Sequence, residues 1–289
     1  MRMDDERDSR NVEDRRGRGG GSGFPGGRVA AGGGIGAVII AVIVMLLGGD
    51  PAVVLEGGRA PSSTEQAARA PARTAEPGGD AEARFVSRVL ASTEDVWTAE
   101  FRRNGREYEV PRLVLFSGAV QSGCGGARAE MGPFYCPADR RVYIDLAFFR
   151  EMQRKLGAGG DFAQAYVIAH EVGHHVQQLL GILPRTTEIQ QRAGRNSAES
   201  NAISVRVELQ ADCLAGFWAR RAQEMRGILE RGDVEEGLNA AAAVGDDRMM
   251  AGHGSVSRES FTHGSSRERV GWFRRGLEAP DVGACNTFG

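Results

Sequence analysis

A short motif near the middle of the 289-residue chain combines two histidines and a glutamate at helical spacing. It reads His-Glu-Val-Gly-His over residues 170–174, inside a segment (161–181) whose apolar residues recur at helical intervals. His170 and His174 lie one turn apart, so both imidazoles can hold one metal ion. Glu171 lies about 100° further around the helix, where its carboxylate can take a proton from a water molecule. The spacing predicts a zinc site with Glu171 as the general base.

A third protein ligand is expected, because a catalytic zinc usually has three protein ligands and one open position. The segment 196–221 has helical apolar spacing, and Glu208 and Asp212 lie one turn apart on one of its faces. Glu208 would complete a set of two histidines and one carboxylate, and Asp212 would accept the other ring N–H of a ligating histidine. The alternative is a solvated acid pair that forms surface bridges with Arg206 or Arg220.

Several long motifs are similar to those of a known family. The segments HEVGHHVQQLLG, VRVELQADCLAGFWA, GDDR, FTHGSSRERVGWFRRG and ACNTF resemble the neutral zinc metallopeptidases, the YpfJ-like family of bacterial membrane proteins. The resemblance covers most of the chain. It implies a zincin-like peptidase domain on an N-terminal anchor, with Glu208 as the third ligand and Asp212 as a supporting partner. The segment 251–260, which contains His253, departs from the family pattern but lies away from these motifs.

Peptide hydrolysis needs a further donor for the oxyanion that develops in the transition state. His263 is the leading candidate, because it precedes a helix start and could reach back to the cleft; a structural or surface-loop role is the alternative. Tyr143 and Tyr166 are weaker candidates. His175 should point about 100° away from His174, toward solvent or into a local hydrogen bond.

The remaining patterns predict an α+β fold, mostly helical over residues 85–289 with a small antiparallel hairpin, and the resemblance implies that this domain is zincin-like. The hairpin strands are FYC and RVYID, on either side of the turn PADR. The strand VYID is a candidate sheet edge on which an extended peptide substrate could lie. Hydrophobic residues make up 41% and charged residues 26% of the chain, which excludes wholesale disorder.

The N-terminal region predicts attachment to a membrane. Residues 1–28 are polar and rich in arginine and glycine, which predicts a disordered cytoplasmic tail, and residues 50–84 predict a flexible stalk. Residues 29–49 contain no charged side chain and would form a helix of roughly 31 Å, which matches one bilayer crossing. A cleaved signal peptide and a buried soluble helix are the alternatives. The preceding arginines predict a single-pass protein of the cell membrane with its N-terminus cytoplasmic and its peptidase domain extracytoplasmic.

The chain contains four cysteines, and disulfides are permitted if the domain lies outside the cytoplasm. Of the three possible connectivities we expect Cys124–Cys136 and Cys213–Cys285. Free buried thiols and metal ligation are the alternatives.

Together these features predict a membrane-anchored zinc metallopeptidase, an endopeptidase with one Zn²⁺ per chain and a protein or peptide substrate. With 36 Lys and Arg against 38 Asp and Glu, the net charge of −2 gives no basis for non-specific nucleic-acid binding. The alternative is a non-catalytic, zinc-stabilised envelope binding or scaffold protein with the same fold. Glu171 favours the enzyme, because a binding module has no need of a carboxylate at that position. None of the motifs specifies the substrate or the oligomeric state.

Overall fold

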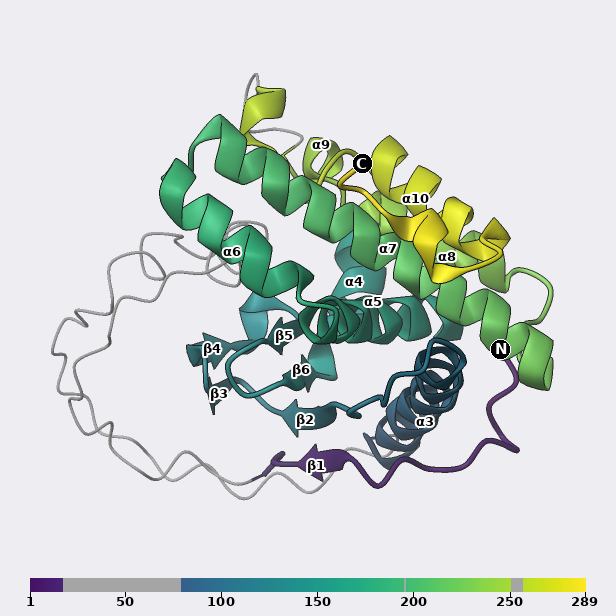
Figure 1. Cartoon of the computed structure of the whole chain (residues 1–289). Helices are drawn as coiled ribbons and strands as arrows, with labels where there is room; N and C mark the ends of the chain where they lie inside the picture. The colour runs from purple at the N-terminus through teal and green to yellow at the C-terminus, as the bar shows by residue number, and fades with distance from the viewer. Residues whose placement is uncertain (18–78, 195, 251–256) are drawn as a thin grey trace, which may run out of the picture.

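The structure is a computed structural model that describes residues 1–17, 79–194, 196–250 and 257–289. Helices form the larger part of it, so the predicted α+β, mostly helical class is confirmed (Figure 1). The described helices are α3 (Gly79–Arg103), α4 (Ala147–Leu156), α5 (Asp161–Leu179), α6 (Ile182–Ala193), α7 (Ala198–Arg226), α8 (Asp233–Ala243), α9 (Asp246–Met249) and α10 (Ser266–Glu278).

The described strands form a four-stranded sheet and a separate hairpin. The sheet order is β1 (Val12–Asp14), β2 (Arg112–Phe116), β6 (Arg141–Asp145) and β5 (Phe134–Cys136). The hairpin pairs β3 (Ala119–Ser122) with β4 (Gly125–Arg128). The predicted hairpin around PADR is confirmed as the antiparallel pair β5–β6, but β1–β2 and β2–β6 are parallel, so the sheet is mixed.

The predicted edge strand is wrong. β6, which contains VYID, lies between β2 and β5, so β5 forms that edge of the sheet. The pairing of β6 with β2 joins strands that are distant in sequence, and local periodicity carries no information about such a partner. The side of β5 that is turned away from β6 is an edge of the described sheet. Strand β5 packs against helix α5.

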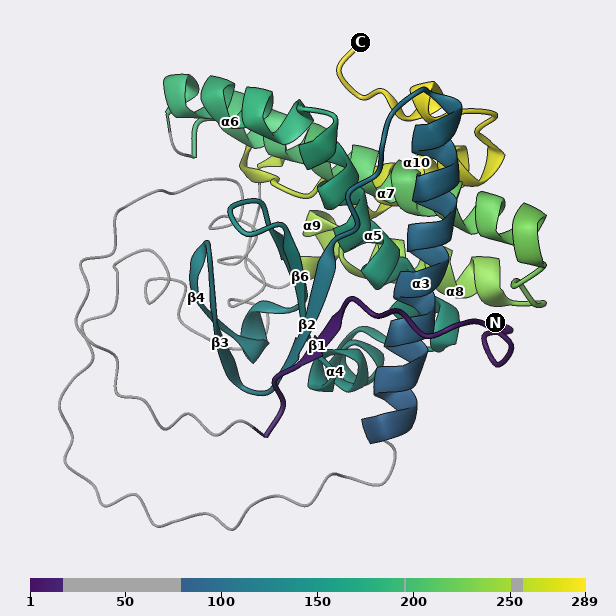
Figure 2. The same ribbon diagram turned by 60° about the horizontal axis from the view of Figure 1, so that its bottom comes forward.

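The N-terminal segment 1–17 lies folded against the domain, which contradicts the predicted disordered tail (Figure 2). Its strand β1 pairs with β2, and the carboxylate of Glu94 on α3 accepts hydrogen bonds from Arg7, Ser9 and Asn11. The composition of the segment predicts disorder because the segment has no core of its own. Its partners come from α3 and β2, which a local analysis does not consider.

The predicted span 29–49, the remainder of the predicted tail and most of the predicted stalk lie outside the described residues, as does His253. Among the helices that the structure describes, none is long and apolar enough to cross a membrane. Helix α3 begins at Gly79, so the last part of the predicted stalk, up to residue 84, belongs to the domain.

Helices α5 and α7 cross at the centre of the fold, and α10 packs along α7 (Figure 1). Gly216 on α7 and Gly276 on α10 make this packing possible, because a Cβ atom on either would overlap backbone atoms of the opposite helix. A Cβ on Gly173 of α5 would lie 3.1 Å from the carbonyl oxygen of Ala211 on α7, closer than most real contacts. These glycines let the three helices approach closely enough for short side chains to meet between them.

Both predicted disulfides are present. Cys124–Cys136 joins the turn between β3 and β4 to β5, with the Cα atoms 5.8 Å apart. Cys213–Cys285 joins α7 to the C-terminal segment, with the Cα atoms 5.5 Å apart. The second disulfide fixes the C-terminal end of the chain one residue after Asp212 on the same helix.

Candidate metal centre

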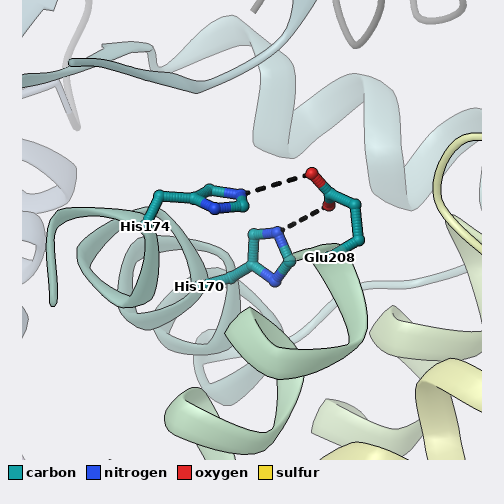
Figure 3. Close-up of side chains that lie close together, drawn as sticks. All are labelled: His170, His174 and Glu208. Carbon is teal, nitrogen blue, oxygen red and sulfur yellow. Dashed lines mark hydrogen bonds and ion pairs between the residues drawn. The ribbon is translucent and has the colours of Figure 1, made fainter. Parts of the chain in front are cut away.

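Two helices bring three metal-binding side chains together in the buried interior (Figure 3). Helix α5 supplies His170 and His174, and α7 supplies Glu208. The Nε2 atom of His170 lies 3.1 Å from Glu208 Oε2, and the Nε2 atom of His174 lies 3.4 Å from Glu208 Oε1. One ligand atom from each residue lies within 4.8 Å of the others, so the three could coordinate a single ion.

The surroundings of these residues fit a bound zinc ion. His170 Nδ1 lies 2.9 Å from Asp212 Oδ1, and His174 Nδ1 lies 2.9 Å from Gln177 Oε1. An Nδ1–H donated to an oxygen leaves the Nε2 lone pair of each ring for the metal. Glu208 Oε1 is buried and has no hydrogen-bond partner among the described residues, so its lone pairs are available to coordinate a metal ion. Two imidazole nitrogens and one carboxylate oxygen are a typical zinc donor set.

The charges of the site balance one another without a metal. Burial lowers the pKa of His170, but its hydrogen bonds to Asp212 and Glu208 outweigh this and raise the pKa to about 10. Burial raises the pKa of Glu208, but the imidazoles of His174 and His170 hold it well below its ordinary value. A metal ion would therefore replace a proton on His170 and meet a carboxylate that is already ionised.

Arg269 on α10 neutralises the buried carboxylate of Asp212, a role that the sequence reasoning missed. Its Nε lies 2.8 Å from Asp212 Oδ2 and its Nη2 lies 2.9 Å from Oδ1. Burial raises the pKa of Asp212, but Arg269 and His170 outweigh it and keep the net shift downward. The hydroxyl of Tyr166 also donates to Asp212 Oδ1 at 2.5 Å, so it is engaged there rather than offered to a substrate. The sequence feature that could have pointed to Arg269 is its position in the motif FTHGSSRERVGWFRRG, which the chain shares with the family.

Glu171 is buried beside the two imidazoles and faces the edge strand β5. Burial raises the pKa of Glu171, and the charges of His174 and His170 oppose this shift only in part. The backbone N–H of Tyr135 in β5 also stabilises the ionised form. The carboxylate predicted to act as general base thus interacts both with the candidate metal ligands and with the backbone of β5.

A turn at residues 262–264 is organised around Asp246, which the sequence reasoning also missed. Asp246 Oδ2 accepts hydrogen bonds from three consecutive backbone N–H groups, at 2.8, 2.7 and 2.9 Å. Its Oδ1 lies 3.1 Å from His263 Nδ1. Asp246 therefore holds both the backbone of the turn and the ring of His263. Its position in the motif GDDR was the available signal.

His263 lies beside the candidate ligand Glu208. A Cβ on the neighbouring Gly264 would lie 3.3 Å from the side chains of Val205 and Leu209, so the turn packs on the stretch of α7 that includes Glu208. A charge on His263 helps to lower the pKa of Glu208. His263 is buried, and within the part of the chain that the structure describes its Nε2 has no hydrogen-bond partner. Asp246 thus holds Nδ1 of the His263 ring, and Nε2 is the ring nitrogen that makes no hydrogen bond within the described residues.

The remaining candidates have structural roles. His175 is buried rather than exposed to solvent, and its hydrogen bonds are with residues distant in sequence rather than local. Its Nδ1 lies 3.0 Å from the hydroxyl of Tyr135 and its Nε2 lies 2.6 Å from the carbonyl oxygen of Glu109. It thereby holds β5 against α5. Tyr143 donates its hydroxyl to Asp139 at 2.6 Å.

The fold and the donor set define a candidate zinc centre of the metallopeptidase type. The chain belongs to the family described as "Putative neutral zinc metallopeptidase", whose model matches residues 1–288. The resemblance inferred from the motifs is thus confirmed.

Two bacterial relatives illustrate the similarity. "Uncharacterized protein YpfJ" of Escherichia coli K12 is 49% identical over 292 residues, which cover 100% of this chain and 99% of that protein. An uncharacterized protein of Mycobacterium tuberculosis H37Rv is 43% identical over 222 residues, 73% of each chain. No solved structure matches the chain.

Proposed function

We propose that the protein is a zinc-dependent peptidase in which His170, His174 and Glu208 hold the metal. The observation that carries the proposal is the convergence of these three donors with the buried carboxylate of Glu171 beside them. Membership of the zinc metallopeptidase family supports the same reaction class. A protein that used zinc only for stability would not need an acid with a raised pKa next to the ligands.

The roles of the residues follow from their positions. His170, His174 and Glu208 would hold a zinc ion, which would supply Lewis-acid activation of a water molecule and of the scissile carbonyl. Glu171 takes the proton of the attacking water and then delivers it to the leaving amine. With its Nδ1–H donated to Asp246, His263 can donate from Nε2 only as an imidazolium, and in that form it would stabilise the developing oxyanion. Asp212 accepts the Nδ1–H of His170 and fixes its tautomer.

The substrate is proposed to be a protein or peptide that lies extended along β5. This strand is at the sheet edge, and its residue Tyr135 has its backbone N–H near the carboxylate of Glu171. A peptide that adds to such an edge is held through its main chain, which places a scissile amide near the general base.

The decisive experiment compares zinc content and peptidase activity in the full-length wild type and three variants. Glu171→Gln is expected to keep one zinc per chain and to lose at least about 100-fold in kcat, the range for a missing general base. Glu208→Ala is expected to lose zinc and activity together. Glu107→Gln, at an exposed position, serves as the matched control and should behave as wild type.

Zinc would be measured by mass spectrometry and cleavage by release of fragments from denatured casein and from a quenched peptide library. Unchanged cleavage by Glu171→Gln would remove this residue from the mechanism. A wild type that binds no zinc after incubation with it would refute the proposal as a whole. Zinc binding without any cleavage would favour the zinc-stabilised binding protein.

A further inference from the structure

The N-terminal segment 1–17 occupies a surface formed by α3 and the outer edge of β2. The side chain of Met3 is 4% exposed and belongs to the main hydrophobic core. Strand β1 pairs with β2, and hydrogen bonds flank the pair on both sides: Leu113 N–H to the Asn11 carbonyl at 2.9 Å and Arg15 N–H to the Leu115 carbonyl at 2.8 Å. Burial and backbone pairing together make the segment a structural part of the domain.

Polar contacts give this docking its specificity. Glu94 of α3 has a side chain only 5% exposed, and its carboxylate accepts hydrogen bonds from three residues of the segment. Arg7 pairs with both Glu94 and the neighbouring Asp95, at 2.9 and 2.6 Å. The backbone N–H of Ser9 also donates to the hydroxyl of Ser87 at 3.0 Å. A buried carboxylate needs such donors, because leaving it unpaired is strongly unfavourable.

The docking restricts how the intervening chain can meet a membrane. Between residues 17 and 79, the sequence has a single uncharged stretch of membrane-spanning length, 29–49. Its length matches one crossing of a bilayer, whereas two crossings need about 40 apolar residues. One crossing would put β1 and β2 on opposite sides of the membrane, where they cannot pair.

We propose that residues 1–17 and 79–289 lie on the same side of the membrane and that residues 29–49 do not carry the chain across it. The two disulfides place the shared side outside the reducing cytoplasm. The proposal replaces the orientation expected from the arginines that precede residue 29, two of which, Arg15 and Arg16, form ion pairs within the fold. It concerns topology only and does not depend on the proposed peptidase activity.

The test uses full-length chains that each carry one added cysteine, Arg10→Cys in the N-terminal segment or Arg102→Cys in α3. Both positions are exposed, and all four native cysteines are paired, so the wild type is an unlabelled control. Spheroplasts of an expression host and inverted membrane vesicles are treated with a membrane-impermeant maleimide. Labelling after detergent solubilisation verifies that each added thiol is reactive.

The expected result is that both cysteines are labelled in spheroplasts and both are protected in inverted vesicles. Protection of both cysteines in spheroplasts and labelling of both in inverted vesicles would also show that the two segments lie on the same side of the membrane. That side would then be the cytoplasmic one. Recovery of the whole protein in the soluble fraction supports the absence of a crossing. Labelling of Arg102→Cys in spheroplasts with protection of Arg10→Cys would overturn the proposal.

A second measurement tests the docking itself in the detergent-solubilised full chain. Glu94→Gln removes the buried charge that Arg7, Ser9 and Asn11 share, and Glu107→Gln is the exposed control. Trypsin should cut after Arg10 or Arg15 at least about 10-fold faster in Glu94→Gln than in the control, as loss of a charged hydrogen bond predicts. Equal and rapid cutting of both variants and the wild type would show that the segment is not docked.

Discussion

Two buried aspartates near the candidate zinc site each contact the Nδ1 of a histidine, but their charges are balanced in different ways. Asp212 faces the guanidinium of Arg269, which comes from another helix, at 2.8 and 2.9 Å. Asp246 faces three backbone N–H groups of the turn that carries His263. Both carboxylates are fully buried. The contact of Arg269 with Asp212 depends on how α10 packs against α7. The backbone N–H groups that bind Asp246 all belong to one short turn.

Substitutions on the two sides of the site should therefore have different effects. A substitution of Asp212 should weaken zinc binding, because Asp212 orients the imidazole of His170, a candidate metal ligand. A substitution of Asp246 should leave zinc binding unchanged and alter only the position of His263.

The largest expected effect comes from removing the distant cation. Arg269→Met would leave Asp212 buried without its charge partner, which typically destabilises a fold by about 3–5 kcal/mol. Arg274→Met, at an exposed position on the same helix, should stay within about 0.5 kcal/mol of wild type. Urea unfolding of both full-length variants measures the difference. Equal stabilities would mean that the guanidinium does not stabilise Asp212.

The next effect concerns the residue that the backbone-balanced aspartate holds. His263→Ala should lower kcat about 100- to 1000-fold, the usual result of removing one oxyanion donor, while zinc content stays at the wild-type level. Steady-state kinetics and metal analysis on the same preparation would show this. A kcat equal to that of the wild type would leave His263 with a structural role only.

A smaller effect separates the two aspartates directly. Asp212→Asn should weaken zinc binding about 10- to 100-fold, because the residue that orients a ligating histidine is altered. Asp246→Asn should leave zinc affinity unchanged and lower kcat instead. Competition with a zinc-binding dye measures both affinities. If both variants lost zinc to the same extent, the difference between the two sides would disappear.

The smallest effect tests the helix packing that delivers Arg269. Gly216→Ala places a methyl group into the backbone of α10 and should destabilise the protein by about 1–3 kcal/mol. Gly271→Ala on α10 meets no atom within 4 Å and should stabilise the helix by about 0.5–1 kcal/mol. Thermal unfolding compares the two. Similar shifts in the same direction would show that the close helix approach is not needed.

Local patterns predicted the parts of the site that lie on one element. The four-residue spacing of His170 and His174 and the offset of Glu171 depend only on helix geometry. The pair Glu208 and Asp212 follows from the same rule on α7. The hairpin β5–β6 is likewise local, because a short turn joins its strands. The disulfide pairing was expected by choosing among three connectivities, and the structure contains it.

Long-range contacts account for the errors. The segment 1–17 is ordered because α3 and β2 supply its partners, and β6 is an internal strand because β2 pairs with it. Arg269 and Asp246 were missed because neither shows in sequence that it is buried against a site formed by other helices. In each case the deciding partner is far away along the chain.

The sequence by itself determined the chemistry of the candidate site: which side chains can bind a metal, and which carboxylate stands beside them. Helix periodicity suffices for His170 and His174, because residues four apart share a face in any helix, whereas Glu208 on another helix was expected also from the resemblance to the family. Only the tertiary structure decided how those groups are charged and held, since burial and the approach of Arg269, Asp246 and the backbone of residues 262–264 set the electrostatics. It also decided that the N-terminal segment is part of the domain, because a strand without a core of its own is stable only when another strand pairs with it.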